Sequence, residues 1–280
     1  YVLGNAAECE PYLTIDYRTI HESTEKIIDG LHIEMKITDA EKGIIVLEDN
    51  KKNCLPILET AIEKLGYKDS ISVVLVKTKY PQGGEKSIVK AVLNKEIPAG
   101  KLPADVGCVV SNISTVKAIS DAIQTGMPLI ERVATVTGPK IKNPGNFIVK
   151  IGTNVKDLID YCGGVTDDDV TYKAGGQMMG FVLSDVNVPI MKGSNGIIAI
   201  EPNISTAVEC IKCGRCMDVC PMELTPLYFA KLADAEDWMG MKEKNVMDCL
   251  ECRCCEYICS SKIPLVSKIK AGKAAIRGMK

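Results

Sequence analysis

The chain has 280 residues, of which 46% are hydrophobic and 25% are charged, and its formal net charge is -2. This composition allows a sizeable core, and it excludes the basic surface that is typical of nucleic-acid-binding proteins. No apolar run approaches the roughly 18–20 residues that a membrane-spanning helix needs.

Residues 1–128 alternate between strand-like and helix-like segments. A strand-like run opens the chain, and further short strands are expected at 43–48 and 71–77. The helical pattern occupies residues 14–31, 55–65, 87–93 and 114–125. Alternation of this kind is typical of a layered α/β domain, which we expect for residues 1–128.

The pattern changes near Met127 and Pro128, where a second domain is expected to begin. Its strand-like segments cover 132–138, 145–150, 181–183 and 193–200, and its helical segment covers 154–162. A small sheet crossed by one helix is the economical interpretation of residues 129–200. From Glu201 onward the strand pattern disappears, so residues 201–280 are expected to be helical. The lysine-rich end, 262–280, is expected to be an exposed helix.

Cysteine is abundant in the third segment. The chain has thirteen cysteines, nine of which fall between Cys210 and Cys259. Two stretches repeat one pattern, C-I-K-C-G-R-C-M-D-V-C-P and C-L-E-C-R-C-C-E-Y-I-C-S, and both contain C-x2-C-x2-C-x3-C. This spacing holds [4Fe–4S] clusters, with the fourth cysteine of each run serving the other cluster. Structural zinc usually takes two separated C-x-x-C pairs, so zinc fits the pattern poorly.

The spacing assigns four thiolates to each of two clusters. One set is Cys210, Cys213, Cys216 and Cys259, and the other is Cys249, Cys252, Cys255 and Cys220. Cys254 is the ninth cysteine, either an alternative ligand or a side chain packed near the cluster. Such clusters carry single electrons, so the rest of the chain must supply a two-electron cofactor or a docking surface.

Three short stretches of the α/β domain differ from ordinary scaffold. They are N-A-A-E-C-E-P at 5–11, K-Y-P-Q-G-G-E-K at 79–86 and V-S-N-I-S-T-V at 110–116. Each follows a strand-like run, which is where open α/β sheets place ligands. Glycines directly before a helix also let backbone N–H groups approach a phosphate. Taken singly, each stretch is equally consistent with a surface loop, a turn or a helix cap.

Together and in this order, the stretches resemble one family. They are similar to RnfC, the peripheral subunit of the Rnf complex, and more distantly to the flavoprotein subunit of respiratory complex I. The first matches that flavoprotein's N-A-D-E-x-E-P loop, the second its Y-x-x-G-E-E loop and the third its N-N-V-E-T. The stretches V-T-G-P, G-G-Q-M-M-G and K-G-S-N-G-I of the second domain resemble the family's β-grasp (SLBB) domain.

The resemblance implies a complete electron path. It implies an FMN- and NADH-binding domain at 1–128, a β-grasp SLBB domain at 129–200 and a helical ferredoxin domain with two [4Fe–4S] clusters at 201–280. FMN would exchange hydride with NAD(H) and pass electrons singly to the clusters. The implied flavin contacts are Asn5, Glu8, Tyr80, Gly83, Gly84, Glu85, Asn112 and Thr115, and Glu10 would lie toward the nicotinamide nucleotide. No catalytic side chain is predicted.

The same resemblance implies an assembly. The chain would be a translocase subunit of a membrane-bound ferredoxin:NAD+ oxidoreductase that moves Na+ or H+. It would lie peripherally on the cytoplasmic face of the bacterial membrane, against the membrane subunits and the ferredoxin-accepting iron–sulfur subunit. No nucleic-acid partner is expected.

Two departures from the family pattern concern the flavin site. Ala7 replaces the aspartate of the complex I loop, and the family's glycine-rich loop with its lysine is missing upstream. We therefore expect the chain to begin between two halves of a flavin site. One alternative is a soluble RnfC-like donor of NADH electrons to a cytosolic reductase, such as proline reductase. Another is a non-catalytic iron–sulfur docking module.

Overall fold

The computed structural model describes residues 1–203 and 205–279. The chain divides into two compact units, one from Tyr1 to Pro202 and one from Asn203 to the end of the chain. Residues 204 and 280, both within the third expected domain, lie outside the described residues. No helix of the described residues is long and apolar enough to cross a membrane.

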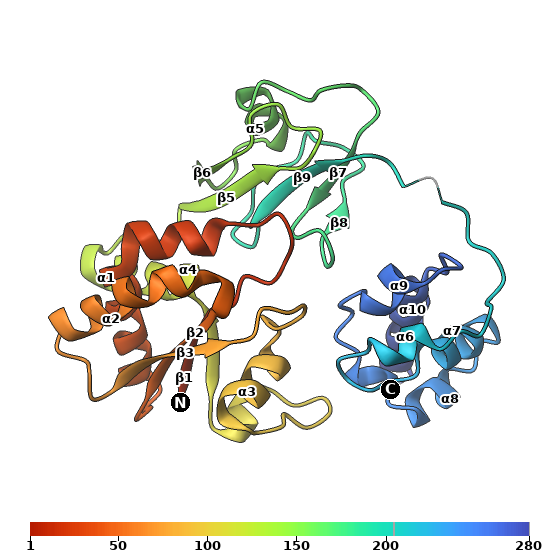
Figure 1. Ribbon diagram of the computed structural model, residues 1–280, viewed down its shortest axis with the longest axis horizontal. Coiled ribbons are helices and arrows are strands. Elements are labelled where there is room, and N and C mark those ends of the chain that lie inside the picture. Colours follow the sequence, from red (N-terminus) through yellow and green to blue (C-terminus); the bar gives the residue numbers. More distant parts are fainter. Residues whose placement is uncertain (204, 280) are drawn as a thin grey trace. The chain divides into compact units, whose positions relative to one another are not determined.

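A parallel four-stranded sheet organises the first part of the Tyr1–Pro202 unit (Figure 1). Its strands lie in the order β3-β2-β1-β4. They are β1 (Val2–Ala6), β2 (Gly43–Glu48), β3 (Ile71–Val76) and β4 (Val109–Asn112). The helices between and after them are α1 (Ile15–Ile37), α2 (Leu55–Lys64), α3 (Glu85–Leu93) and α4 (Ile113–Thr125), with 3-10 turns at Asp49–Cys54 and Pro103–Val106. The expected α/β class is confirmed.

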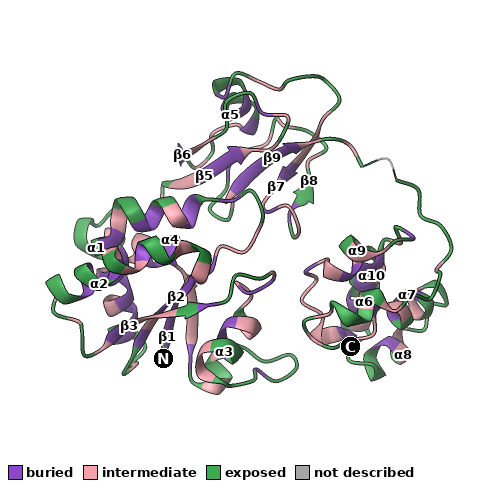
Figure 2. Ribbon diagram, in the orientation of Figure 1, coloured by how far each residue is buried: buried purple, intermediate pink, exposed green. Residues whose placement is uncertain are grey.

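Side-chain alternation along the strands gives this sheet two buried faces. Val2 of β1 and Ile45 of β2 pack with α1, α2 and α4, whereas Leu3 and Val46 pack against α3 on the opposite face. Successive strand residues point to opposite faces, so helices on both sides are required to cover the apolar side chains. Buried residues accordingly gather on the strands and on the inner faces of the helices (Figure 2).

Helix α1 is longer than the sequence pattern indicated. It continues from Leu31 to Ile37 and buries Met35 in the core beside β2. Gly30 does not end the helix, because it lies where α1 crosses α4. A Cβ atom at Gly30 would lie 1.9 Å from the carbonyl oxygen of Val116. The glycine therefore permits close packing of two helices rather than a turn.

A second sheet completes the same unit. Its strand order is β6-β5-β9-β7-β8, with β5 and β9 parallel and the other neighbours antiparallel. The strands are β5 (Glu131–Thr137), β6 (Gly145–Lys150), β7 (Thr171–Ala174), β8 (Phe181–Val182) and β9 (Gly196–Ile200), and the helix is α5 (Val155–Tyr161). Helix α5 packs Val155, Leu158 and Ile159 on one face of this sheet. The expected sheet crossed by one helix is present, and β7 is an additional strand.

The two sheets of this unit touch through the segment that precedes α1. Thr14 N donates a hydrogen bond to Thr135 Oγ1 of β5 at 3.3 Å, and a Cβ at Gly196 would lie 2.4 Å from Leu13. Residues 1–202 therefore form a single compact unit, within which the expected boundary between 128 and 129 stays a prediction.

The second unit is helical. It contains α6 (Arg215–Asp218), α7 (Pro226–Asp234), α8 (Trp238–Glu243), a 3-10 turn at Val246–Asp248, α9 (Cys254–Ile258) and α10 (Leu265–Gly278). Phe229, Met241, Val246 and Ile269 form its central core. The expected helix at the lysine-rich end is present as α10, but the expectation that it is exposed was wrong for one of its faces. Helix α10 buries Leu265, Val266, Ile269, Gly272 and Lys273, because its apolar residues fall on one helical face between the exposed lysines.

Candidate cofactor sites

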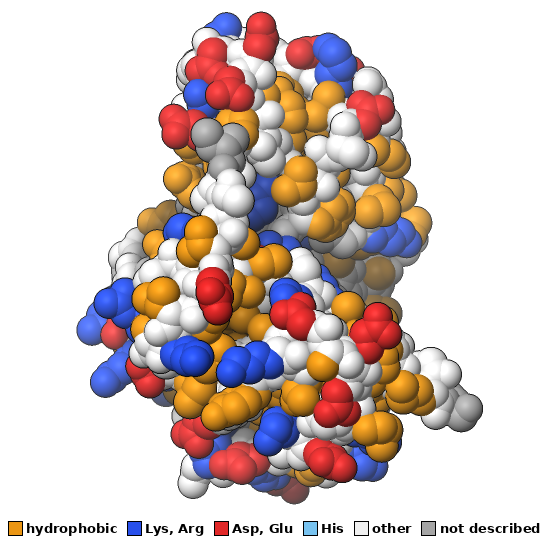
Figure 3. Space-filling view, turned by 90° about the vertical axis from the view of Figure 1, so that its right-hand side faces the viewer, with side chains coloured by type: hydrophobic (Ala, Val, Ile, Leu, Met, Phe, Trp, Pro, Cys, Tyr) orange, Lys and Arg blue, Asp and Glu red, His pale blue; other side chains and the backbone are white. Residues whose placement is uncertain are grey.

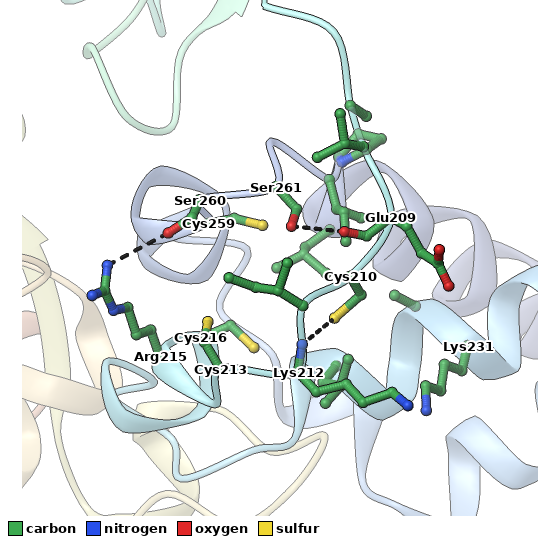
Figure 4. A pocket seen from close by; sticks show the side chains of 18 of the residues that line it. Glu209, Cys210, Lys212, Cys213, Arg215, Cys216, Lys231, Cys259, Ser260 and Ser261 are labelled. Carbon is green, nitrogen blue, oxygen red and sulfur yellow. Dashed lines mark hydrogen bonds between the residues drawn. The ribbon is translucent and has the colours of Figure 1, made fainter.

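Four thiols of the helical unit surround one cavity. Cys210, Cys213, Cys216 and Cys259 line a volume of about 560 Å³. Cys210 and Cys213 precede α6, Cys216 lies within it, and Cys259 directly follows α9. Figure 4 shows their sulfur atoms around a common space. The fold thus brings together the first three cysteines of one run and the last cysteine of the other, as the assignment requires.

The remaining cysteines gather in a second, much smaller cavity of about 20 Å³. Its lining includes Cys220, Cys249, Cys252 and Cys255, the second expected ligand set, together with Cys254. Burial raises the pKa of Cys255 to about 12, whereas a hydrogen bond with Cys254 lowers the pKa of Cys252 to about 6. Cys254 therefore contacts an expected ligand, and its own role as an alternative ligand stays open.

A cluster and a single ion need different arrangements of donors. In the part of the chain that the structure describes, no three His, Cys, Asp or Glu side chains form a group that could hold one metal ion. Zinc requires four ligands about 2.0–2.3 Å from one point. In a [4Fe–4S] cube each thiolate binds a different iron, so the four sulfurs lie farther apart. The two expected ligand sets line the two cavities and supply four thiols for each of two such cubes.

The three unusual loops of the α/β part meet at one edge of its sheet. The first begins at the end of β1, the second follows β3, and the third spans the end of β4 and the start of α4; the carboxyl ends of these parallel strands share that edge. Asn5 Nδ2 donates to the carbonyl of Gly83 at 2.9 Å, and Asn5 Oδ1 accepts from Ala7 N at 3.0 Å. A Cβ at Gly83 would lie 2.4 Å from the carbonyl oxygen of Ala7. Asn5 and Gly83 thus hold two loops against each other.

Glu8 and Asn112 are engaged with the beginnings of two helices. The Glu8 carboxylate accepts from Asp16 N at 2.9 Å and Tyr17 N at 3.4 Å in the first turn of α1. Asn112 caps α4 by accepting from Ser114 N at 2.9 Å, and its Nδ2 donates to Asp16 at 2.9 Å. Burial raises the pKa of Glu8 to about 7 and that of Asp16 to about 6, and the Asp16 charge raises that of Glu8 further.

Glu10 reaches the second sheet. Its carboxylate accepts hydrogen bonds from Met178 N and Met179 N, both at 2.8 Å, and lies 3.5 Å from the Tyr80 hydroxyl. Gly176 makes this approach possible, because a Cβ there would lie 2.2 Å from the Glu10 carboxyl carbon. The expected position of Glu10 near a nicotinamide stays a prediction. In this structure the carboxylate joins the first loop to the segment between β7 and β8.

The other expected flavin contacts lie at helix beginnings on the same edge. Gly84 is the N-cap of α3 and Glu85 is its exposed first residue. Thr115 is exposed in the first turn of α4. Two helix N-termini therefore bring their partial positive charge to this edge, an arrangement suited to a phosphate.

Sequence reasoning missed three polar residues at this edge. Glu48 ends β2 with an exposed fraction of 0%; its Oε2 lies 2.9 Å from Lys51 Nζ. Both line a cavity of about 370 Å³ together with Glu8, Cys9, Glu10 and Tyr80. Among the described residues, Glu48 Oε1 and Gln82 Nε2 are buried without a hydrogen-bond partner. In the sequence, Glu48 is marked by its position, because it is a charged residue directly after the apolar run G-I-I-V-L.

Buried polar atoms without partners are costly, so they indicate a place where a polar ligand is accommodated. Together with the two helix N-termini, they make this edge chemically suited to a flavin mononucleotide. The glycines and asparagines predicted as contacts mainly hold the loops in place.

Comparison with known families gives three consecutive matches. Residues 1–121 match the Nuo51 FMN-binding domain, residues 133–182 match the SLBB domain, and residues 203–260 match a 4Fe-4S dicluster domain. The expected order of fold classes and the expected flavin and [4Fe–4S] cofactors agree with these matches.

Curated relatives match most of the chain. The chain is 46% identical over 248 residues to the RnfC protein of the proton-translocating ferredoxin:NAD(+) oxidoreductase complex of Clostridium ljungdahlii, covering 87% of this chain and 53% of that protein. It is 40% identical over 278 residues to the corresponding protein of the Na(+)-translocating complex of Acetobacterium woodii, covering 98% and 62%. The chain thus spans a little over half the length of these relatives.

Solved structures share the fold. An NAD+-reducing [NiFe]-hydrogenase in the H2-reduced state aligns with a TM-score of 0.65 at 13% sequence identity, covering 99% of this chain and 54% of that chain. The air-oxidised form aligns with a TM-score of 0.60 at 14% identity, covering 86% and 47%. At this identity the likeness concerns the fold alone.

Proposed function

We propose, from the premise that this chain is a relative of the RnfC proteins of ion-translocating ferredoxin:NAD(+) oxidoreductase complexes, that it carries electrons between NAD(H) and two [4Fe–4S] clusters through FMN. The two cavities, one lined by the four thiols of the first expected ligand set and one by the four of the second together with Cys254, are the observation that carries the proposal. Pairs of clusters on one small unit serve electron transfer, and the polar sheet edge of the other unit supplies the place for a two-electron cofactor.

Residues at the sheet edge divide into two groups under this proposal. Tyr80, Glu85 and Thr115, with the N–H groups at the starts of α3 and α4, would contact the flavin. Asn5, Glu8, Gly83, Gly84 and Asn112 would hold the loops and helices that surround it. Bound FMN would accept two electrons together as hydride and release them singly.

Glu10 would affect a nicotinamide bound at this edge indirectly, by holding the loop between β7 and β8 in place. Its carboxylate fixes the backbone of Met178 and Met179 at 2.8 Å, at the side of the sheet edge that the SLBB part covers. Buried Glu48, paired with Lys51 at 2.9 Å, would keep one negative and one positive charge at fixed positions in the same cavity. Fixed charges of this kind tune a cofactor without rearranging during the reaction.

We further propose that the protein works as a translocase subunit of a membrane-bound ferredoxin:NAD+ oxidoreductase. It would lie peripherally on the cytoplasmic face of the membrane, beside the membrane subunits and the iron–sulfur subunit that accepts ferredoxin electrons. The relatives' naming as members of ion-translocating complexes supports this placement.

The test is anaerobic purification of the full-length protein, followed by measurement of iron, flavin and the visible spectrum before and after NADH. About eight irons are expected from two [4Fe–4S] clusters, with one flavin and bleaching of the cluster absorbance by NADH. The same iron content with no flavin and no response to NADH would leave only an electron-carrying docking module and would refute the catalytic proposal.

A further inference from the structure

The two cluster cavities differ in how they meet the surface of the helical unit. Around the larger cavity Cys213 is exposed and Cys210, Cys216 and Cys259 are half-buried. Around the smaller cavity Cys252 and Cys255 are buried. A partner that exchanges electrons with this unit would therefore reach the Cys210 set first.

The mouth of the larger cavity combines apolar and basic side chains with two carboxylates, those of exposed Glu209 and of Asp234, so that basic groups outnumber acidic ones. Val208 and Ile211, on either side of Cys210, are exposed at 60% and 66%. Lys212, Arg215 and Lys231 line the same cavity and are exposed. In the space-filling view, hydrophobic side chains lie beside lysines and arginines on this unit's surface (Figure 3).

Ion pairs within the fold do not neutralise all of these basic side chains. Lys268 pairs with Asp234, whereas Lys212 and Lys231 form no ion pair within the described residues. Their amino groups point toward the same side of the cavity (Figure 4). The Arg215 guanidinium contacts the Ser260 hydroxyl, at 3.4 Å, rather than a carboxylate of the cavity lining. Bringing like charges together costs free energy unless an opposite charge binds them.

We propose that this mouth, formed by Val208, Ile211, Lys212, Arg215 and Lys231, is the docking surface for an electron-carrying protein with acidic side chains around its own redox group. One electron would pass between the Cys210-set cluster and the partner, so that one is oxidised as the other is reduced. The inference rests on the proposed function only for the presence of the clusters.

Interfaces that exchange electrons are small and transient, and they combine an apolar centre with charged surroundings. Complementary charge mainly raises the association rate, and salt lowers that rate by screening. Ile211 and Val208 would form the apolar centre nearest the cluster, and the three basic residues would attract the acidic partner. Electron exchange with a cluster at this mouth needs a partner that carries a redox group of its own, which a lipid surface does not.

Oxidation of the reduced clusters by small probes of opposite charge tests the surface. The full-length protein is reduced with dithionite, so the test does not depend on flavin or NADH, and is then mixed in a stopped-flow instrument with anionic cobalt(III)–EDTA or with cationic cobalt(III) hexaammine. A two-cluster acidic ferredoxin, oxidised beforehand, serves as the protein probe. The variant Lys212→Glu/Lys231→Glu reverses two charges, and the control is Lys242→Glu, at an exposed lysine of α8.

For the double variant we expect the rates with cobalt–EDTA and with ferredoxin to fall about tenfold at low salt. The rate with the hexaammine should rise, and all differences should shrink as salt is added. Lys242→Glu should behave as the unaltered protein does. If the charge reversal lowers iron content, Lys212→Gln/Lys231→Gln is measured instead, with the same directions expected.

Three outcomes would overturn the proposal. One is that the double variant reacts with every probe at the unaltered rate. Another is that rapid-freeze EPR finds the Cys249-set cluster oxidised first. The third is that the double variant loses binding to phosphatidylglycerol vesicles but keeps its rate with ferredoxin, which would assign the surface to a membrane. Failure of NADH to reduce the clusters would count against the proposed function alone.

Discussion

Buried ionisable side chains lie beside both candidate cofactor regions. Lys273 is 6% exposed, and its Nζ donates to the Cys249 carbonyl at 2.9 Å and pairs with Glu251 at 2.6 Å. At the sheet edge, burial raises the pKa of both Glu8 and Asp16, and the Asp16 charge raises that of Glu8 further. Burying an ionised side chain costs free energy. Ionisable groups that are kept at such positions therefore mark places where a charge can influence a bound cofactor or the stability of the fold.

Lys273 should raise the reduction potential of the Cys249-set cluster. A buried positive charge within hydrogen-bond distance of a ligand's backbone favours the more negative, reduced cluster. We expect Lys273→Met to shift the midpoint of that cluster to more negative potential and to leave the Cys210-set cluster nearly unchanged. An EPR-monitored redox titration measures both. Lys270→Met is the control, because Lys270 pairs with Glu251 at 3.6 Å from a half-exposed position; equal shifts in both clusters would contradict the prediction.

Glu8 should make the sheet edge less stable as pH rises. Its pKa is raised to about 7 in the folded chain, against an ordinary value of 4.5, chiefly by burial and then by Asp16. Between these values the folded chain holds more protons than the unfolded chain, so this contribution to stability declines as pH rises. We expect Glu8→Gln to raise the melting temperature, relative to the unaltered protein, more at pH 7.5 than at pH 5. An equal difference at both pH values, or the same trend in exposed Glu59→Gln, would exclude this role.

At the scale of elements, the packing depends on a few positions where a glycine lets atoms of a distant residue come close to the backbone. Gly30 lets α1 cross α4, and Gly176 lets the Glu10 carboxylate reach two backbone N–H groups of the β7–β8 loop. A glycine at such a position is indistinguishable in the sequence from a glycine in a turn. The neighbouring atom comes from a residue far away along the chain, such as Val116 or Glu10.

Gly30→Ala should destabilise the Tyr1–Pro202 unit strongly. The added Cβ would lie 1.9 Å from a backbone oxygen, which cannot move without separating the two helices. Overpacking of this kind costs about 1–3 kcal/mol or more. We expect a melting temperature several degrees lower, measured by calorimetry on the full-length protein. Gly193→Ala is the control because no atom lies within 4 Å of the added group; a similar loss there would point to a general effect of added side chains.

Glu10→Gln should loosen the β7–β8 loop without unfolding either sheet. Hydrogen bonds to a charged acceptor contribute about 1.5–3 kcal/mol each, and Gln supplies one neutral oxygen in place of two charged ones. We expect amide exchange at Met178 and Met179 to quicken by about tenfold or more, with exchange in β2 unchanged. Hydrogen–deuterium exchange with mass spectrometry checks this, and unchanged protection of the loop would show that Glu10 does not hold it.

Helix and strand positions followed mostly from local pattern, and the exceptions have physical causes. Strand β2 occupies the residues expected, because an apolar run between polar residues marks a buried strand. Strand β7 escaped prediction because four residues carry too little pattern, and pairing with distant β9 determines it. The cysteine spacing indicated which thiols meet. The orphan polar atoms of Glu48 and Gln82 could not be foreseen, since burial of one atom depends on the whole fold.

At the scale of the whole molecule, the two compact units rely on different sources of stability. The Tyr1–Pro202 unit has two sheets with three groups of buried side chains. The helical unit has two small groups, one of which includes Cys255, an expected ligand. Small domains bury too little apolar surface to be robust, and bound metal contributes to folding where the ligands come together only in the folded state.

Removing iron should therefore unfold the helical unit first. We expect the full-length protein, after anaerobic treatment with acid and chelator and return to neutral pH, to lose protection from amide exchange along α7 and α10. The amides of β1, β2 and β5 should keep theirs, because no expected iron ligand lies in the first unit. Thiols must give up their protons to bind iron, so reconstitution should also slow as pH falls. If α7 and α10 stayed protected without iron, the packing of Phe229, Met241 and Ile269 would be sufficient by itself, and the clusters would serve electron transfer without supporting the fold.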